Sequence, residues 1–154
     1  MKIWQIGLII QIAAFLLPSS TVAETVSATA GLANTQVVAI TSAAYDPGDV
    51  SRNTLRAIFL MRYAKWDDGM PVKVYVFSDT DPKHEIFTKE VLRFLPRQLR
   101  LAWDRQVFSG LGQYPEQVFS VQDMLNKVKT TPGSVGYLSM QEVTKDVRIL
   151  QIRP

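Results

Sequence analysis

Cysteine is absent from the 154-residue sequence, and this absence removes several classes of site at once. A chain without cysteine has no lipoprotein anchor, no disulfide framework and no thiolate metal site. Histidine is scarce too, because His84 is the only one. A single histidine does not make a histidine-based metal site, and the ligand spacings of known metal sites are missing. We therefore expect no metal and no cofactor.

A strong charge of either sign is also missing. The formal net charge is +3, and it falls to +2 when an N-terminal segment that carries only Lys2 is removed, since 3 − 1 = 2. Such a small excess predicts no nucleic-acid partner. The basic residues between Arg93 and Arg105 are spread along an amphipathic segment, a pattern typical of a solvated helix face.

Long apolar runs are confined to one place, Ile3 to Leu17. Lys2 gives this run a positively charged start, and Pro18 to Ala23 supplies a helix breaker and a small-residue cleavage site, which together predict a signal peptide over residues 1–23. An uncleaved anchor is the alternative, but the run is shorter than the roughly 20 residues of a membrane-spanning helix. We expect cleavage and a soluble periplasmic protein, with residues 24–35 as a flexible lead-in.

The remaining residues, 36–154, are long enough for one domain with its own core. Their apolar patterns predict strands that alternate with helices, which is typical of an α/β fold with a sheet covered by helices. The expected strands are 36–40, 72–77, 134–138 and 147–152. The expected helices begin after Ser51, at Lys83, at Arg97 and after Ser120, with a break at Leu95 before Pro96.

Side-chain patterns add finer expectations. Val72 to Phe77 alternates at the two-residue period of a half-buried strand. Leu95 and Trp103 fall at helical spacing on apolar faces and are expected in the core. Phe119 and Met124 are placed to form a hydrophobic staple at the start of the last helix.

The most informative stretch joins the central strand to the next helix. Asp81 is placed as the N-cap of that helix and Pro82 as its first residue. In an open α/β sheet such a loop lies at the carboxyl end of the strand, where ligands usually bind. Ser78, Asp79 and His84 could supply a nucleophile, an acid and a base, but three such residues in one loop are far commoner as capping and surface groups. We therefore predict binding and no catalysis.

Several short segments occur in a characteristic order, namely Ala57 to Leu60, Trp66 to Gly69, Ser78 with Asp79, Trp103 before Phe108 to Gly110, and Thr131 to Tyr137. Together they resemble the substrate-binding proteins of phosphate ABC transporters, and more closely the short, single-domain members of that periplasmic-binding superfamily. The similarity covers about Val37 to Leu138. It implies a type 2 periplasmic-binding fold with a mixed sheet flanked by helices, and a periplasmic location. Full-length members have two lobes that close on the anion, whereas this chain can supply little more than one.

The resemblance extends to the phosphate-binding loop, with departures. In the family an arginine, a serine, an aspartate and a Ser-Gly-Thr run at a helix N-terminus capture phosphate. In this chain Ser78 and Asp79 match, Phe77 stands at the arginine position, Thr80 replaces a glycine, and the Ser-Gly-Thr positions hold Asp81, Pro82 and Lys83. Proline has no N–H to offer an anion, and an N-cap aspartate occupies the remaining donors. Lys83 and His84 return some positive charge to the first turn.

What the resemblance implies is recognition of a small oxyanion, with phosphate as the family's default, and a membrane transporter or sensor protein as partner. The candidate ligand-binding residues are Ser78, Asp79, Thr80, Lys83 and His84, joined by Thr41 and Ser42. We expect this last pair at the same edge of the sheet, because it follows the first strand. The alternative is a protein-interaction or sensor-accessory module that kept the fold and lost the anion site, which Phe77 and Pro82 favour.

Overall fold

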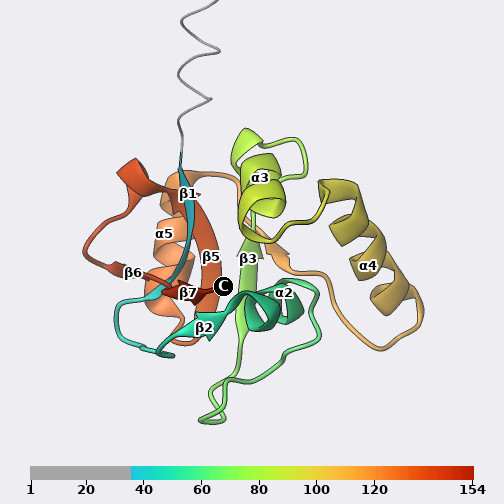
Figure 1. Cartoon of the computed structure of the whole chain (residues 1–154), viewed down its shortest axis with the longest axis horizontal. Coiled ribbons are helices and arrows are strands. Elements are labelled where there is room, and N and C mark those ends of the chain that lie inside the picture. Colours follow the sequence, from blue (N-terminus) through green and yellow to red (C-terminus); the bar gives the residue numbers. More distant parts are fainter. Residues whose placement is uncertain (1–35) are drawn as a thin grey trace, which may run out of the picture. The chain divides into compact units, whose positions relative to one another are not determined.

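The computed structural model describes residues 36–154, which belong to one compact unit (Figure 1). The expected signal peptide, residues 1–23, and the expected lead-in, residues 24–35, lie outside the described residues. No helix within the described part of the chain is long and apolar enough to cross a membrane.

A mixed sheet forms the centre of the domain. Across residues 36–154 it has five strands in the order β4-β3-β5-β1-β6. β3 runs parallel to β4 and β5, whereas β1 runs antiparallel to β5 and β6. A second, two-stranded sheet pairs β2 with β7. The bounds are β1 Val37–Ser42, β2 Val50–Ser51, β3 Lys73–Val76, β4 Glu116–Gln117, β5 Ser134–Ser139, β6 Val147–Ile149 and β7 Ile152–Arg153.

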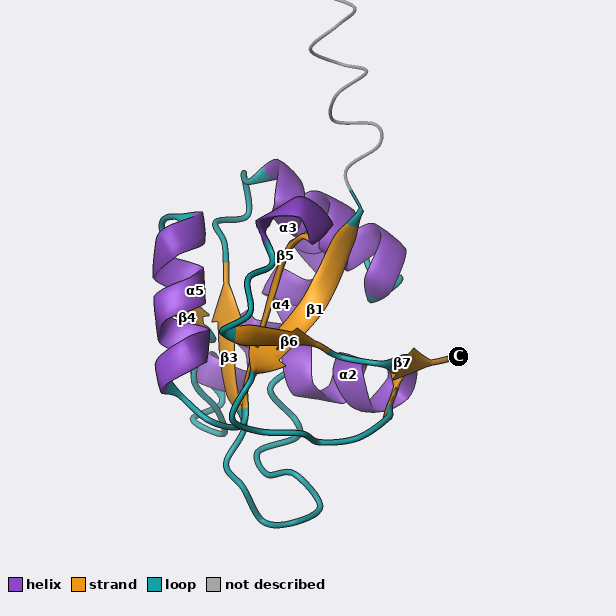
Figure 2. Ribbon diagram, turned by 90° about the vertical axis from the view of Figure 1, so that its left-hand side faces the viewer, coloured by secondary structure: helices purple, strands orange, loops and turns teal. Residues whose placement is uncertain are grey.

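Helices cover both faces of this sheet, with α5 on one side and α2 on the other (Figure 2). Successive residues of a strand point to opposite faces of the sheet. In β5, two neighbouring residues show what covers each face. A Cβ on Gly136 would meet the Met124 side chain of α5, whereas the next residue, Tyr137, stacks on Phe87 at 4.1 Å between ring centroids. The predicted α/β class, a single lobe with a mixed sheet flanked by helices, is confirmed. The helices are α2 Arg52–Phe59, α3 Pro82–Ile86, η1 Phe87–Val91, α4 Pro96–Phe108, α5 Val121–Thr130 and η2 Met140–Glu142.

The central strand is more deeply buried than its sequence predicts. Val74, Tyr75, Val76 and Phe77 are all buried, so the expected half-buried alternation is wrong. The reason is that β3 lies between β4 and β5 in a sheet with helices on both faces, which leaves neither side of the strand to solvent.

The predicted helix starts are confirmed by their caps. The side chains of Ser51, Asp81 and Ser120 each accept a hydrogen bond from a main-chain N–H in the first turn of α2, α3 and α5. Each cap satisfies a donor that would otherwise have no partner within the helix. The expected staple at α5 is wrong, however, because Phe119 is 86% exposed and does not pack on Met124.

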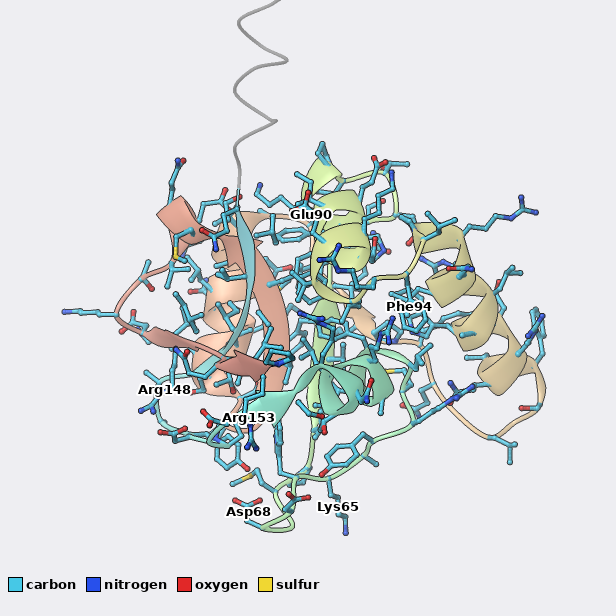
Figure 3. All side chains as sticks on the ribbon, in the orientation of Figure 1. Lys65, Asp68, Glu90, Phe94, Arg148 and Arg153 are labelled. Atoms are coloured by element: carbon cyan, nitrogen blue, oxygen red, sulfur yellow. The ribbon has the colours of Figure 1, made fainter. Side chains whose placement is uncertain are left out.

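Two predicted elements are divided in the structure. The helix expected from Lys83 continues from α3 into the π-helical turns of η1, and Arg93 then takes a left-handed conformation with φ 57°. Phe94, labelled in Figure 3, has its ring 4.8 Å from the Arg56 guanidinium. Leu95 is extended before Pro96 as predicted, but it is 55% exposed and not part of the core. The strand expected over 147–152 is split into β6 and β7.

Candidate functional site

The carboxyl end of β3 leads directly into the predicted loop. Ser78 is half-buried and Asp79 more exposed, and Asp81 then caps α3, which Figure 1 shows above the end of β3. β5 is parallel to β3, so the residues after β5 reach the same edge. Lys83 Nζ lies 3.2 Å from Glu142 Oε1 of η2. This edge therefore brings together five of the predicted residues, namely Ser78, Asp79, Thr80, Lys83 and His84.

Thr41 and Ser42 lie at the other end of the sheet, and the expectation that they share an edge with the loop is wrong. Thr41 pairs with Val135 near the start of β5, and its Oγ1 donates to the Ser134 carbonyl oxygen at 2.7 Å. Ser134 also pairs with Lys73 at the start of β3. The physical reason is the direction of β1, which is antiparallel to β5, so that its carboxyl end meets the amino ends of β3 and β5.

A further residue, Arg100 of α4, completes the site. Its Nε donates to Asp79 Oδ2 and its Nη2 to Asp79 Oδ1, both at 2.7 Å. The guanidinium also lies 5.0 Å from the Trp103 ring and 5.8 Å from the Tyr114 ring. The hydrogen bond to Arg100 lowers the pKa of Asp79, and the same bond raises the pKa of Arg100. No sequence motif links Arg100 to Asp79.

The hydrogen bonds to Asp79 use only some of the N–H donors of the Arg100 guanidinium. Arginine has five N–H donors, and Asp79 takes two of them. Among the described residues Arg100 makes no other hydrogen bond. Its side chain is 38% exposed, so part of it faces solvent.

His84 is enclosed behind the loop rather than displayed on it. It is 1% exposed, and its Nδ1 lies 2.6 Å from the Tyr137 hydroxyl. That hydroxyl accepts from the Phe77 N–H at 2.9 Å, and its own hydrogen is available for Nδ1; in the neutral ring that donates from Nε2, the hydroxyl donates to Nδ1. Nε2 has no hydrogen-bond partner in residues 36–154, and Asp79 Oδ1 is 3.8 Å away.

The main-chain donors of the loop are largely committed within the loop itself. The Thr80 N–H donates to Ser78 Oγ, the Asp81 N–H to the Ser78 carbonyl oxygen, and the Lys83 N–H to Asp81 Oδ1. Pro82 has no N–H at all. The main chain of the loop therefore does not form a cradle of free N–H donors.

Among the described residues, this edge has neither a nucleophile paired with a base nor a cluster of metal ligands. The Ser78 hydroxyl pairs with Thr80 Oγ1 at 3.1 Å, and within the described chain no hydrogen bond joins it to His84, so a nucleophile and base are not in contact. The described residues also contain no cluster of three His, Cys, Asp or Glu side chains that could hold a metal ion.

Burial of His84 makes stability depend on pH. Burial is the largest cause that lowers its pKa below 6.5; the charge of Asp79 raises the pKa, and the charge of Arg100 lowers it further. The unfolded chain therefore takes up a proton near pH 6.5, where the folded ring is still neutral, and we expect the free energy of unfolding to fall with decreasing pH below about 6.5. The slope should reach at most about 1.4 kcal/mol per pH unit. Urea unfolding at a series of pH values measures it.

The control for this pH dependence is the variant His84→Asn, which removes the only imidazole. Between about pH 5 and 8 histidine is the side chain that ordinarily titrates, so the variant should lose most of the slope whatever its absolute stability. Equal slopes in both proteins would contradict the assignment of a neutral, buried ring.

Comparison with known proteins gives structural matches only. No protein-family model matches the chain, and no curated protein sequence does. Its fold is similar to that of a Clostridium perfringens protein solved with bound phosphate and provisionally named a phosphate ABC transporter substrate-binding protein, with TM-score 0.61 and 15% identity, over 77% of this chain and 45% of that one. It is similar to PstS from Borrelia burgdorferi, with TM-score 0.58 and 16% identity, over 77% and 47%.

A third match is an ABC-type phosphate transport receptor from Vibrio cholerae, with TM-score 0.55 and 14% identity, over 77% of this chain and 46% of that one. The chain has the fold of one lobe of these binding proteins. It spans about half the length of each of the three. The resemblance stated from the sequence is thus confirmed at the level of the fold, and these structural neighbours are binding proteins rather than enzymes.

Proposed function

We propose that this chain is a solute-binding-like protein that recognises a small oxyanion, with phosphate as the first candidate, at the carboxyl end of β3. The observation that carries the proposal is Arg100, which Asp79 anchors by two hydrogen bonds while its three other donors have no hydrogen-bond partner in residues 36–154. The fold is similar to that of a protein solved with bound phosphate, and ligands of open α/β sheets usually bind at the carboxyl ends of the strands.

Arginine suits this role because its planar guanidinium binds an oxyanion through two parallel hydrogen bonds. The family's arginine position is filled by Phe77, which is buried and meets the Tyr137 ring edge-on. We infer that Arg100 supplies the missing guanidinium from α4. The hydroxyl groups of Ser78 and Thr80, on either side of Asp79, are hydrogen-bonded to each other, which leaves one of the two O–H groups for an anion.

The proposal includes the cellular location, the domain organisation and the partner of the chain. We propose that residues 1–23 direct export to the periplasm. Residues 24–35 are then a flexible lead-in, and residues 36–154 form the binding domain. Since two of the matched proteins are described as parts of phosphate ABC transport, a membrane transporter or sensor protein is the proposed partner that receives the bound solute. The reaction is non-covalent binding, with no enzyme activity.

The test is the melting temperature of the protein with phosphate, with sulfate and with chloride at equal ionic strength. A ligand that binds only the folded state raises the melting temperature with concentration, by roughly 4 °C for each kcal/mol of stabilisation in a domain of this size. We expect a rise with an oxyanion and none with chloride.

Variants separate this site from a general effect of charge. Arg100→Gln should abolish the oxyanion-dependent rise measured from its own melting temperature, because the guanidinium is lost. Arg105→Gln removes the same charge from the same helix without touching Asp79 and should keep the full rise. An unshifted wild-type protein, or a rise that survives Arg100→Gln, would overturn the proposal.

A second candidate is a protein-interaction or sensor-accessory module. The observation that favours it is the loop itself, whose N–H donors are committed to Ser78 and Asp81 and whose Pro82 has none. A folded protein that shows no shift with any oxyanion would favour this function.

A further inference from the structure

Apolar side chains gather on the outward side of α4 and on the turn that follows it. Phe108 is 85% exposed, Leu111 84% and Leu101 43%. Arg97, Leu101, Arg105 and Phe108 are spaced by four, four and three residues, so they form one stripe along the helix. Figure 1 shows α4 at the outer end of the domain, far from α5. We call Arg97, Leu101, Arg105, Phe108 and Leu111 the α4 surface.

The opposite side of α4 is fixed to the domain, so the helix is not free to turn this stripe inward. Leu99 and Trp103 are buried. Trp103 Nε1 donates to the Phe59 carbonyl oxygen at 2.7 Å, and the Gln106 side chain donates to the Leu60 carbonyl oxygen. The α4 surface is therefore displayed by a helix with a fixed orientation.

The turn after α4 is ordered as well. Gly110 has φ 70°, its N–H donates to the Val107 carbonyl oxygen at 3.0 Å, and the Leu111 N–H donates to the Gln106 carbonyl oxygen at 3.0 Å. This pair of bonds is the Schellman motif, in which the residue after the glycine usually packs back on the helix. Leu111 instead points to solvent. Two large apolar side chains thus protrude together from a rigid helix end.

The charge of the α4 surface has one sign. Arg97 and Arg105 form no ion pair within residues 36–154. The nearby carboxylate of Asp104 accepts a hydrogen bond from the Tyr114 hydroxyl at 2.8 Å. The surface therefore combines protruding apolar groups with cations that have no ion pair in the described residues, two features that it shares with surfaces that bind anionic membranes.

We propose that the α4 surface docks the domain on an anionic phospholipid bilayer. Phe108 and Leu111 enter the boundary between headgroups and acyl chains, and Arg97 and Arg105 bind the headgroup phosphates. A bilayer fits side chains that protrude, because it deforms around them and needs no matching pocket. A second copy of the chain fits less well, since self-association along the stripe brings like-charged arginines together.

Co-sedimentation with lipid vesicles tests this. The full chain is mixed with vesicles of phosphatidylcholine alone, or of phosphatidylcholine with phosphatidylglycerol, at low and at high salt. We expect binding to the anionic vesicles that weakens as salt rises. The double variant Arg97→Gln with Arg105→Gln should bind roughly 30-fold more weakly. Phe108→Ser with Leu111→Ser should lose at least roughly tenfold.

Two control variants remove the same kinds of side chain, positive charges and an exposed phenylalanine, from positions outside the α4 surface. Lys65→Gln with Lys145→Gln removes two exposed charges that have no ion pair in the described residues. Phe119→Ser removes a phenylalanine that is 86% exposed but lies between β4 and α5. Both controls should bind like the wild type.

Three outcomes would overturn the proposal: no binding to anionic vesicles at low salt, equal losses in the controls and in the α4 variants, or loss of vesicle binding with Arg100→Gln alone. The last would place the lipid headgroup at the carboxyl end of β3. Failure of vesicle binding leaves the oxyanion-dependent melting shift unaffected, so the two proposals are tested separately.

Discussion

Replacing Trp103 by alanine is expected to lower the free energy of unfolding by about 3 to 5 kcal/mol. Trp103 is 1% exposed and is among the largest fully buried side chains. Its Nε1–H is also the donor for the Phe59 carbonyl oxygen, so the substitution leaves a buried acceptor without a partner as well as a cavity. A loss of this size is a large share of the total stability of a small domain.

Urea unfolding measures this loss, and two further variants divide it into parts. Trp103→Phe keeps much of the buried ring but not the donor, and should fall between the wild type and Trp103→Ala. Leu101→Ala lies on the exposed side of the same helix, and its effect should stay within about 0.5 kcal/mol. If Trp103→Ala cost no more than Leu101→Ala, the anchoring of α4 described above would be wrong.

Gly133→Ala is the second substitution with a large expected effect. Gly133 has φ 78°, in the left-handed region that disfavours a Cβ by about 1–2 kcal/mol. An added Cβ would also stand 2.6 Å from Met70 Cγ and 2.7 Å from the Pro71 carbonyl oxygen. Crowding of this kind costs about 1–3 kcal/mol more, and the main-chain oxygen cannot move aside cheaply.

The matched control is Gly48→Ala. Gly48 has a similar φ of 71°, but a Cβ there would meet nothing within 4 Å. It should lose only the conformational part, about 1–2 kcal/mol, so the difference between the two variants isolates the crowding at Gly133. Equal losses in chemical denaturation would show that the turn at Thr131 to Gly133 relaxes around the added methyl group.

Local features could be predicted from the sequence because their causes are local. Ser51, Asp81 and Ser120 each cap a helix by accepting from an N–H two or three residues away, so the residue types and their spacing contain the whole interaction. The break before Pro96 is of the same kind, since proline restricts the residue that precedes it.

Features that depend on distant parts of the chain could not be predicted in this way. The positions of Thr41 and Ser42 depend on the direction in which β1 pairs with β5, and a strand's own residues do not specify that direction. Arg100 reaches Asp79 across 21 residues, through the docking of α4. The sequence gives one indirect indication. Leu99 and Trp103 fix the side of the helix that faces the core, and Arg100 lies beside that side.

The antiparallel pairing of β1 with β5 has a consequence for how the chain is made. Val37 pairs with Ser139 and Thr41 with Val135, which are 139 − 37 = 102 and 135 − 41 = 94 residues apart. Contacts so distant in sequence slow folding, because a long loop must close before they form. On the ribosome β1 stays unpaired until β5 and β6 have been made, and both follow all the α-helices of the described domain in the chain. Such late closure would leave the domain unfolded during synthesis, a state compatible with the export proposed above.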